Sequence, residues 1–167
     1  MDYASNSKAH FNYEILETIE AGLVLTGSEV RSIRTGKISI KGSYVKIING
    51  QAYLIGAVIP PYQPANAPEG YDEQASRKLL LSKKELATLI GLAQSHGLTL
   101  VPLKIYDKKG PARSYSADRQ QKGRTSGGAS HLKLLVGIAK GKKKYDKRES
   151  IKKKDVARAK QRGMSED

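Results

Sequence analysis

The sequence is short of the residues that usually build covalent or metal-held structure. It contains no cysteine and no tryptophan, and only one phenylalanine and two methionines. Without cysteine, neither a disulfide framework nor a thiolate metal site can form. The N-terminus also lacks the apolar run that a secretion signal or a membrane-spanning helix requires. We therefore expect a cytoplasmic protein without a membrane partner.

Groups that would perform catalysis are equally sparse. The histidines His10, His96 and His131 stand alone, with no second ligand at helical or turn spacing. The carboxylates are scattered, so no pair of acid and base can be assigned. Residues 123–128 are rich in glycine, but no strand precedes them and no Gly-Lys-Ser/Thr follows, as a phosphate-binding loop requires. These absences argue against an enzyme, a metal, a cofactor and a small-molecule substrate.

Positive charge is what the chain has in excess. Thirty Lys and Arg against sixteen Asp and Glu give a formal net charge of +14. Residues 140–162 contain twelve basic residues and three acids, a net +9, and residues 108–124 contain six basic residues and one acid, a net +5. The remainder before residue 140 is nearly neutral. Such a distribution indicates a polyanionic partner.

Nucleic acid and an anionic membrane are the two polyanions to consider. Membrane binding requires bulky apolar side chains beside the positive charges. The basic C-terminal segment offers only Ile151, Val156 and Met164. A nucleic acid is therefore the favoured partner.

The length suits one small domain with extensions. We expect the domain over residues 1–143, a basic loop inserted at residues 108–130, and a basic tail over residues 144–167. The loop has almost no apolar residues, so we expect it to be mobile, and either an RNA contact or a tolerated insertion explains it. The three adjacent lysines at 152–154 repel one another, so we expect a disordered tail in a free, monomeric protein.

Alternating patterns dominate the first half of the chain. Residues 11–17 and 23–26 predict two strands joined through residues 20–22. Thr26 and Glu29 have the spacing of a capping box, which predicts a helix over residues 28–35. Asn49-Gly50 predicts a tight hairpin between strands at residues 44–48 and 52–55.

In the second half, the prolines of residues 60–71 predict an exposed loop. Residues 77–81 lead into a second helix, which Ser82 and Glu85 would cap and Gly97 would end. Residues 98–106 and 132–138 predict the two strands of a last hairpin. About six antiparallel strands and two helices indicate a mainly β fold, a small β-barrel of the oligonucleotide-binding type.

Five segments together carry a resemblance to a known family. They are Asn6, residues 20–30 (EAGLVLTGSEV), 77–81 (RKLLL), 139–143 (AKGKK) and 146–149 (DKRE). In this order they resemble the SsrA-binding protein family, also called small protein B. The resemblance implies an oligonucleotide-binding barrel that binds the tRNA-like domain of transfer-messenger RNA. It also implies delivery of that RNA to stalled ribosomes in bacterial trans-translation, with the tail in the empty mRNA channel.

The resemblance also implies which residues act. Those on the RNA-binding side would be Asn6, Lys8, Glu20, Lys78, Leu80, Lys133, Lys140, Lys142 and Lys143. Those of the tail that meet the decoding region of the small ribosomal subunit would be Tyr145, Asp146, Lys147 and Arg148.

Three of these assignments have alternatives. Leu80 would equally suit the core, and Lys133 would also suit a solvated strand edge. A carboxylate repels phosphate, so Glu20 would either accept hydrogen bonds from base or sugar groups or orient a neighbouring RNA-binding residue.

The chain departs from the family pattern in two respects. Phe11 and Tyr145 stand where family members often carry histidine, and the loop at residues 108–130 is longer than the usual hairpin tip. Composition alone also suits a structural ribosomal protein that binds ribosomal RNA, which is the alternative function.

Overall fold

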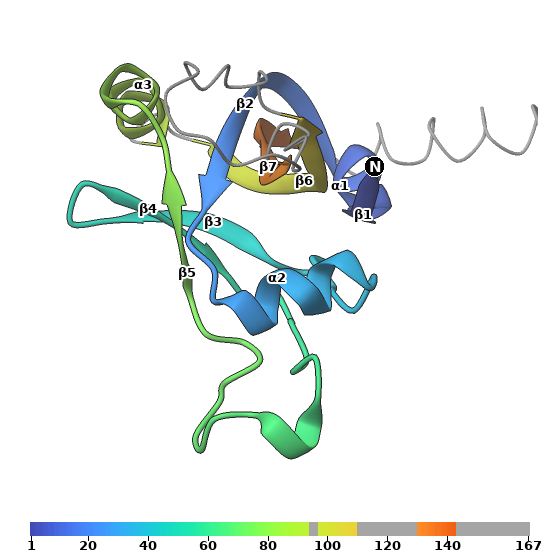
Figure 1. Ribbon diagram of the computed structural model, residues 1–167. Helices are drawn as coiled ribbons and strands as arrows, with labels where there is room; N and C mark the ends of the chain where they lie inside the picture. The colour runs from blue at the N-terminus through green and yellow to red at the C-terminus, as the bar shows by residue number, and fades with distance from the viewer. Residues whose placement is uncertain (94–96, 110–129, 143–167) are drawn as a thin grey trace, which may run out of the picture.

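The computed structural model describes residues 1–93, 97–109 and 130–142 of the chain. Within this part there are seven strands, three α-helices and one short 3-10 helix (Figure 1). In chain order they are β1 (Asp2–Ser5), α1 (Ser7–Asn12), β2 (Tyr13–Leu23), α2 (Gly27–Arg34), β3 (Tyr44–Ile48), β4 (Gln51–Ile55), η1 (Pro64–Asn66), β5 (Arg77–Leu80), α3 (Lys83–Ala93), β6 (Leu98–Lys109) and β7 (Ser130–Gly141).

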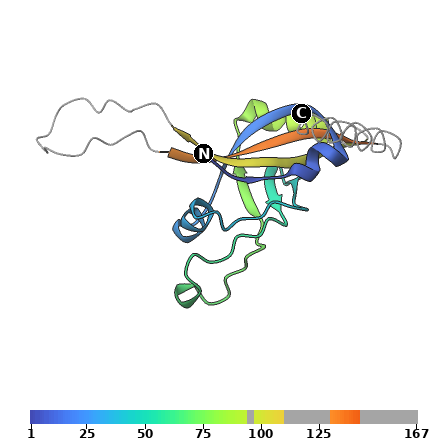
Figure 2. The same cartoon turned by 90° about the vertical axis from the view of Figure 1, so that its right-hand side faces the viewer.

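Six of the strands form a closed ring. The hydrogen-bonded order is β6-β3-β4-β5-β2-β7, and β7 pairs again with β6, while β1 adds to a free part of β6. Every pairing is antiparallel. This arrangement confirms the mainly β fold of oligonucleotide-binding type. Figure 2 shows β6 and β7 as the long hairpin that runs across the molecule.

The core lies inside the ring. Leu54, Ile105 and Leu134 are fully buried there, and Leu89 of α3 belongs to the same cluster. A second, smaller cluster lies on the outside of the ring, where Ala9 of α1 packs on Val101 of β6. α1 therefore covers one part of the outer sheet surface.

The local predictions with a specific cap or turn are confirmed. The Thr26 hydroxyl accepts from the Glu29 amide at 3.3 Å, and the Glu29 carboxylate accepts from the Thr26 amide at 2.8 Å, at the start of α2. Asn49 and Gly50 both have positive φ, 50° and 69°, between β3 and β4. Ser82 and Glu85 form the second capping box, before α3. Residues 60–71 form a loop with the short helix η1.

The prediction of two strands between residues 11 and 26 is wrong. Phe11 lies in α1, and one continuous strand, β2, runs from Tyr13 to Leu23. Pairing with β7 continues from Tyr13 to Gly22, so the chain does not turn at residues 20–22. Strand pairing decides this. Gly22 stays extended because it is paired with Lys133 of β7 on one side and with Leu80 of β5 on the other.

Two further strands have no counterpart in the sequence prediction, and two are longer than predicted. β1 and β5 are each only four residues long and pair with distant strands, so neither has a clear alternating pattern of its own. β6 continues to Lys109 and β7 begins at Ser130, so Lys108 and Lys109 belong to the ladder and not to the loop. The structure also adds α1 to the two predicted helices.

Some predictions concern residues outside the described part. These are His96, loop residues 110–129, Lys143 and the whole tail 144–167. Among the helices that are described, none has the length and apolar character needed to cross a membrane.

Candidate nucleic-acid interface

The outer surface of β5, β2, β7 and β6 carries the first group of predicted site residues. Leu80 is paired with Gly22, Gly22 with Lys133, and Lys133 with Tyr106, so these four residues form one row across four strands. Their sequence neighbours Ala21, Leu134 and Ile105 point inward and are fully buried. By strand alternation, these four residues therefore face outward, and we call them the outward row.

Glu20 lies one row further along the same outer surface and binds three of its neighbours. Its carboxylate accepts a hydrogen bond from the Tyr106 hydroxyl and two from the Lys108 ammonium group, at 2.8 and 3.0 Å. The ammonium group of Lys133 lies 3.9 Å away. Glu20 thus connects β2 with both strands of the long hairpin, and we define Glu20, Tyr106, Lys108 and Lys133 as the Glu20 cluster.

The electrostatics of the cluster favour an ionised Glu20. Hydrogen bonds from Lys108 and then Tyr106 lower the pKa of Glu20 below its ordinary value. Burial, together with the hydrogen bond to Glu20, raises the pKa of Tyr106 to about 12. At neutral pH, Glu20 is therefore an acceptor and Tyr106 a donor, and two lysines offset the single negative charge.

Leu80 is an exposed apolar residue beside these charges. Its relative exposure is 54 %, whereas that of its neighbour Leu79 is 4 %. This exposure excludes the core role considered for Leu80. Gly22 next to it has no side chain, and a Cβ atom there would lie 3.2 Å from the Leu80 Cβ. The Leu80 side chain therefore occupies the space that a side chain at Gly22 would need.

A groove extends from this row toward α2. It is lined by Gly22, Leu80, His131 and Lys133 from the sheet and by Val30 and Arg34 from α2. Lys78, the remaining predicted residue of this group, is opposite Tyr53 of β4. Since Lys78 and Leu80 are two positions apart in β5, they face the same side.

The second group of predicted residues lies around α1. Asn6 is buried, and its side-chain amide donates to the Pro102 carbonyl oxygen at 3.2 Å, which attaches the start of α1 to β6. Lys8 is exposed on α1. Both line a hollow that also includes Lys41, Tyr44 and Thr99.

Lys140 and Lys142 lie near the same helix. Lys140 is exposed and paired with Glu14 of β2. The Lys142 ammonium group donates to the His10 carbonyl oxygen at 2.9 Å. Lys133 and Lys140 are seven positions apart on β7, which corresponds to roughly 23 Å. The structure therefore places the predicted residues that it describes in two groups, one beside Lys133 and one around α1, and does not gather them at one point.

Sequence reasoning does not identify Tyr106, Lys108 and Arg34 as members of the first group. It places Lys108 in the basic loop and Arg34 within the helix predicted over residues 28–35. The signal that could have found Tyr106 and Lys108 is alternation, because Lys104, Tyr106 and Lys108 occupy every second position of one strand. Within residues 1–93, 97–109 and 130–142, no three His, Asp or Glu side chains are grouped to hold a metal ion.

Comparisons with known proteins identify the family. The model of the family described as SmpB protein matches residues 3–116 and 127–166, so the unmatched residues 117–126 lie inside the predicted basic insertion. An SsrA-binding protein of Enterococcus faecalis is 44% identical over 155 residues, which cover 93% of this chain and 87% of that protein. An SsrA-binding protein of Anoxybacillus flavithermus is 44% identical over 163 residues, covering 98% and 92% of the two chains.

A solved structure is also similar. It is described as "tmRNA-SmpB: a journey to the center of the bacterial ribosome", and one of its chains is 38% identical to this protein with a TM-score of 0.60. The match covers 88% of this chain and 92% of that chain. By fold, by sequence and by the extent of the family match, the chain belongs to the SmpB protein family.

Proposed function

We propose that the protein is an RNA-binding adaptor of bacterial trans-translation. It binds the tRNA-like domain of transfer-messenger RNA and delivers that RNA to stalled ribosomes in the cytoplasm, without catalysing a reaction. Family membership, the name SsrA-binding protein borne by relatives 44% identical, and a related chain in a tmRNA-SmpB ribosome structure support this function. They argue against the alternative of a structural ribosomal protein.

The outward row of Leu80, Gly22, Lys133 and Tyr106 is the observation that best supports RNA binding. A folded RNA is recognised mainly through its shape, its phosphates and its unstacked bases. Lys133 and Lys108 supply positive charge, and the exposed Leu80 supplies an apolar contact beside a sheet position that has no side chain. The Leu80 side chain lies over Gly22, with Leu80 Cβ and Cδ1 3.2 and 3.6 Å from the position of a Cβ atom there, so a base or ribose at this point would contact Leu80.

Glu20 acts in this proposal by orienting its neighbours. Its carboxylate oxygens already accept hydrogen bonds from Tyr106 and Lys108, so they are poorly available to RNA. The two lysines are held on the outer surface, where they can meet phosphates. This role explains why an RNA-binding surface contains a carboxylate. Glu20 holds three donor groups in place on neighbouring strands, those of Tyr106, Lys108 and Lys133.

The residues around α1 have a different part. Lys8, Lys140, Lys142 and Lys143 contribute positive charge near the beginning of the tail, and the buried Asn6 positions α1. We further propose that residues 1–143 act as the RNA-binding domain and residues 144–167 as a separate tail. In the ribosome, Tyr145, Asp146, Lys147 and Arg148 would meet the decoding region, and the tail would follow the empty mRNA channel.

Replacing Glu20 and Lys133 together by glutamine tests the RNA-binding step. Measured by fluorescence anisotropy with the tRNA-like domain, the double variant should bind at least about tenfold more weakly. Its free energy of unfolding should change by only about 1 kcal/mol, because partly exposed ion pairs contribute little to stability. Lys46→Gln, an exposed lysine on β3, is the control. Unfolding of the double variant, or unchanged affinity, would contradict the assignment.

A second experiment separates RNA binding from the ribosomal step. A protein ending at Lys144 keeps every described residue and loses the four residues proposed for the decoding region. It should bind the tRNA-like domain with unchanged affinity but fail to support peptide tagging on stalled ribosomes. Tagging at the full-length rate by the truncated protein would contradict the proposed role of the tail.

A further inference from the structure

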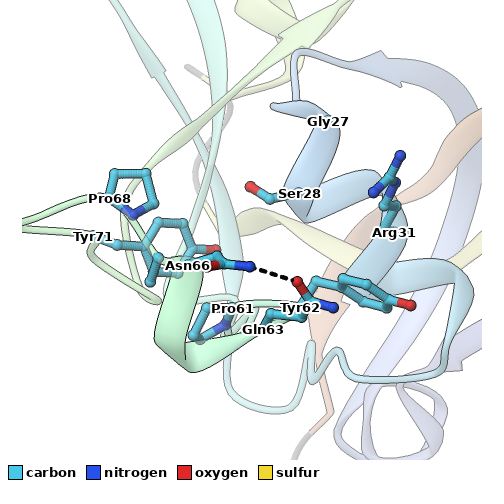
Figure 3. Close-up of a pocket in the computed structure, with 10 residues that line it drawn as sticks. Gly27, Ser28, Arg31, Pro61, Tyr62, Gln63, Asn66, Pro68 and Tyr71 are labelled. Carbon is cyan, nitrogen blue, oxygen red and sulfur yellow. Dashed lines mark hydrogen bonds between the residues drawn. The ribbon is translucent and has the colours of Figure 1, made fainter.

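A further hollow shares no lining residue with the groove beside the outward row. It has a volume of about 330 Å³ and is formed between the beginning of α2 and the loop of residues 61–71. Figure 3 shows Ser28 and Arg31 on the α2 side, Gln63 and Asn66 on the loop side, and the rings of Tyr62 and Tyr71 toward its two ends. None of the residues predicted from the family resemblance lines it.

The loop that forms this hollow is firmly held. The buried guanidinium group of Arg77 donates to the carbonyl oxygens of Ala57 and Glu73, at 3.0 and 2.9 Å, and to the Glu29 carboxylate of α2 at 3.0 Å. The Tyr71 hydroxyl donates to the Ile59 carbonyl oxygen at 2.8 Å. Because these bonds connect the loop to α2 and to β5, the hollow exists before any ligand binds.

The side chains that line the hollow are of types that suit the binding of an unpaired nucleotide. Aromatic rings and prolines offer flat surfaces on which a base can stack, and Arg offers a cation for a phosphate. The amides of Asn66 and Gln63 bond to each other at 2.8 Å and keep further donor and acceptor capacity for a base edge. Within the described part of the chain, the guanidinium group of Arg31 has no hydrogen bond or ion pair to another side chain.

Helix α2 contributes residues both to this hollow and to the groove beside the outward row. Arg34 lines the groove beside Leu80 and Lys133, while Arg31 lines the hollow. The two arginines are three residues apart on α2, so their Cβ atoms are roughly 5–6 Å apart. Arg34 is ion-paired with Asp107 at 3.7 Å. A polyanion that extends from the row past Arg34 would therefore meet Arg31 as the next cation on α2.

We propose that this hollow is a second RNA site that takes one unstacked nucleotide of the RNA bound at the outward row. The base lies against the Tyr62 ring and meets the amides of Gln63 and Asn66, and a neighbouring phosphate lies at Arg31. This inference rests on the proposed function and adds to it a site for a flipped or single-stranded nucleotide. The exposed arginines of α2 then form the connection between the two sites.

Filling the hollow tests the proposal without removing any contact group. A Cβ atom at Gly27 would have no heavy atom within 4 Å, and Gly27 has an ordinary backbone conformation, so a side chain fits there without strain. Gly27→Leu should occupy part of the hollow and weaken binding of the tRNA-like domain of transfer-messenger RNA by about fivefold or more. Gly27→Ala is the matched control and should bind as the original protein does.

Removing the stacking ring gives a second variant. Tyr62→Ala should weaken binding between about fivefold and a hundredfold, the range for one base stacked on an aromatic ring. Tyr62→Phe keeps the ring and should retain most of the affinity. Arg31→Gln should flatten the plot of log affinity against log salt by about 0.7–0.9, which corresponds to one phosphate.

Cross-linking gives a readout that does not depend on affinity. With p-benzoylphenylalanine in place of Tyr62, irradiation should attach the protein to one unpaired nucleotide, located by primer extension. Unchanged RNA affinity of Gly27→Leu and Tyr62→Ala would overturn the proposal, as would cross-links scattered over the RNA or confined to a protein partner. If Lys133→Gln weakens binding while Gly27→Leu does not, the second site fails and the proposed function stands. If the unmodified protein does not bind this RNA, both fail.

Discussion

Two adjacent leucines of β5 have opposite environments. Leu79 points into the core, and Leu80 points outward beside Gly22 and Lys133. Neighbouring residues of a strand face opposite sides of the sheet, so one of the two leucines is buried and the other is exposed. The two are equally hydrophobic in the sequence, and only the strand pairing shows which one is buried. This difference makes the two residues a matched pair for separating stability from binding.

We predict that the two alanine substitutions will have opposite consequences. Leu79→Ala should lower the free energy of unfolding by about 2–5 kcal/mol, because it leaves a cavity in the core. Leu80→Ala should change stability by less than about 1 kcal/mol, but it should weaken binding to the tRNA-like domain. Urea unfolding and fluorescence anisotropy measure the two quantities. A large stability loss in Leu80→Ala would mean that the exposed position has been assigned wrongly.

Glu20 allows a prediction about pH. Its pKa is lowered from an ordinary value of 4.5 by Lys108 and Tyr106. A group with a lowered folded-state pKa stabilises the protein fully above its unfolded-state value, and this contribution is lost as the pH falls through the folded-state value. The stability difference between the original protein and Glu20→Gln should therefore be constant near neutral pH and shrink below about pH 4.5.

Urea unfolding of both proteins between pH 7 and pH 3 measures this difference. Glu17→Gln is the control, since Glu17 is an exposed carboxylate on the same strand. A difference for Glu20→Gln that does not change over this range would show that Lys108 and Tyr106 do not stabilise the ionised carboxylate.

At the scale of elements, one ion pair holds together α2, β5 and the long loop between β4 and β5. Arg77 and Glu29 are both buried, and their side chains approach to 3.0 Å. Glu29 also accepts from the Thr26 amide at the start of α2. A single carboxylate thus caps a helix and pairs with the arginine that fixes residues 57–75.

We predict that Arg77→Leu will lower the free energy of unfolding by about 3–5 kcal/mol, since it leaves Glu29 buried without its partner. Lys78→Leu, the next residue but outward-facing, should cost less than about 1 kcal/mol. Adding Glu29→Gln to Arg77→Leu should recover part of the loss, because the unpaired charge is then gone. Equal unfolding midpoints for Arg77→Leu and Lys78→Leu would contradict this role of the ion pair.

At the scale of the whole molecule, most lysines and arginines of the two basic segments lie outside the described strands, and Lys108, Lys109 and Lys140 are the exceptions within the ladder. The basic excess lies in residues 108–124 and 140–162, while most of the closed ring comes from a nearly neutral part of the chain. The long hairpin carries one basic segment between its strands and the other after β7. A nearly neutral core avoids self-repulsion, and the two extensions supply the attraction for RNA.

A hairpin with a short turn can test the inserted segment. Lys109 and Ser130 are direct partners in the antiparallel ladder, so Asn-Gly can replace residues 110–129 as a two-residue turn. If the four basic residues of this segment bind phosphates, its removal should flatten the plot of log affinity against log salt by roughly 0.7–0.9 for each phosphate that is no longer bound. Thermal unfolding should be nearly unchanged, since the ladder is kept.

The matched control keeps the length of the segment and replaces Arg113, Arg119, Lys122 and Arg124 by glutamine. If charge is what matters, this variant should have the same flattened slope as the short hairpin. An unchanged slope in both variants would mean that the insertion is tolerated without contributing to RNA binding.

The sequence by itself determined the features that depend on neighbouring residues. The two capping boxes, the Asn49-Gly50 turn, the excess of positive charge and the family motifs need no distant partner to be recognised. Local hydrogen bonds and backbone preferences decide the caps and the turn within a few residues, and the charge and the motifs follow directly from residue identity. All of these features could therefore be predicted, together with the mainly β fold and the family.

Only the tertiary structure decided the features that depend on strand pairing. β1 and β5 are strands because distant strands pair with them, and β2 stays extended through Gly22 because β7 continues beside it. The same pairing brings Tyr106 and Lys108 to Glu20, 86 and 88 residues away in sequence. A contact of that separation leaves no local pattern, since neither residue changes the conformation of its own neighbours. The site residues could be named from the motifs, but their division into two groups and the exposure of Leu80 follow from the closed ring of strands.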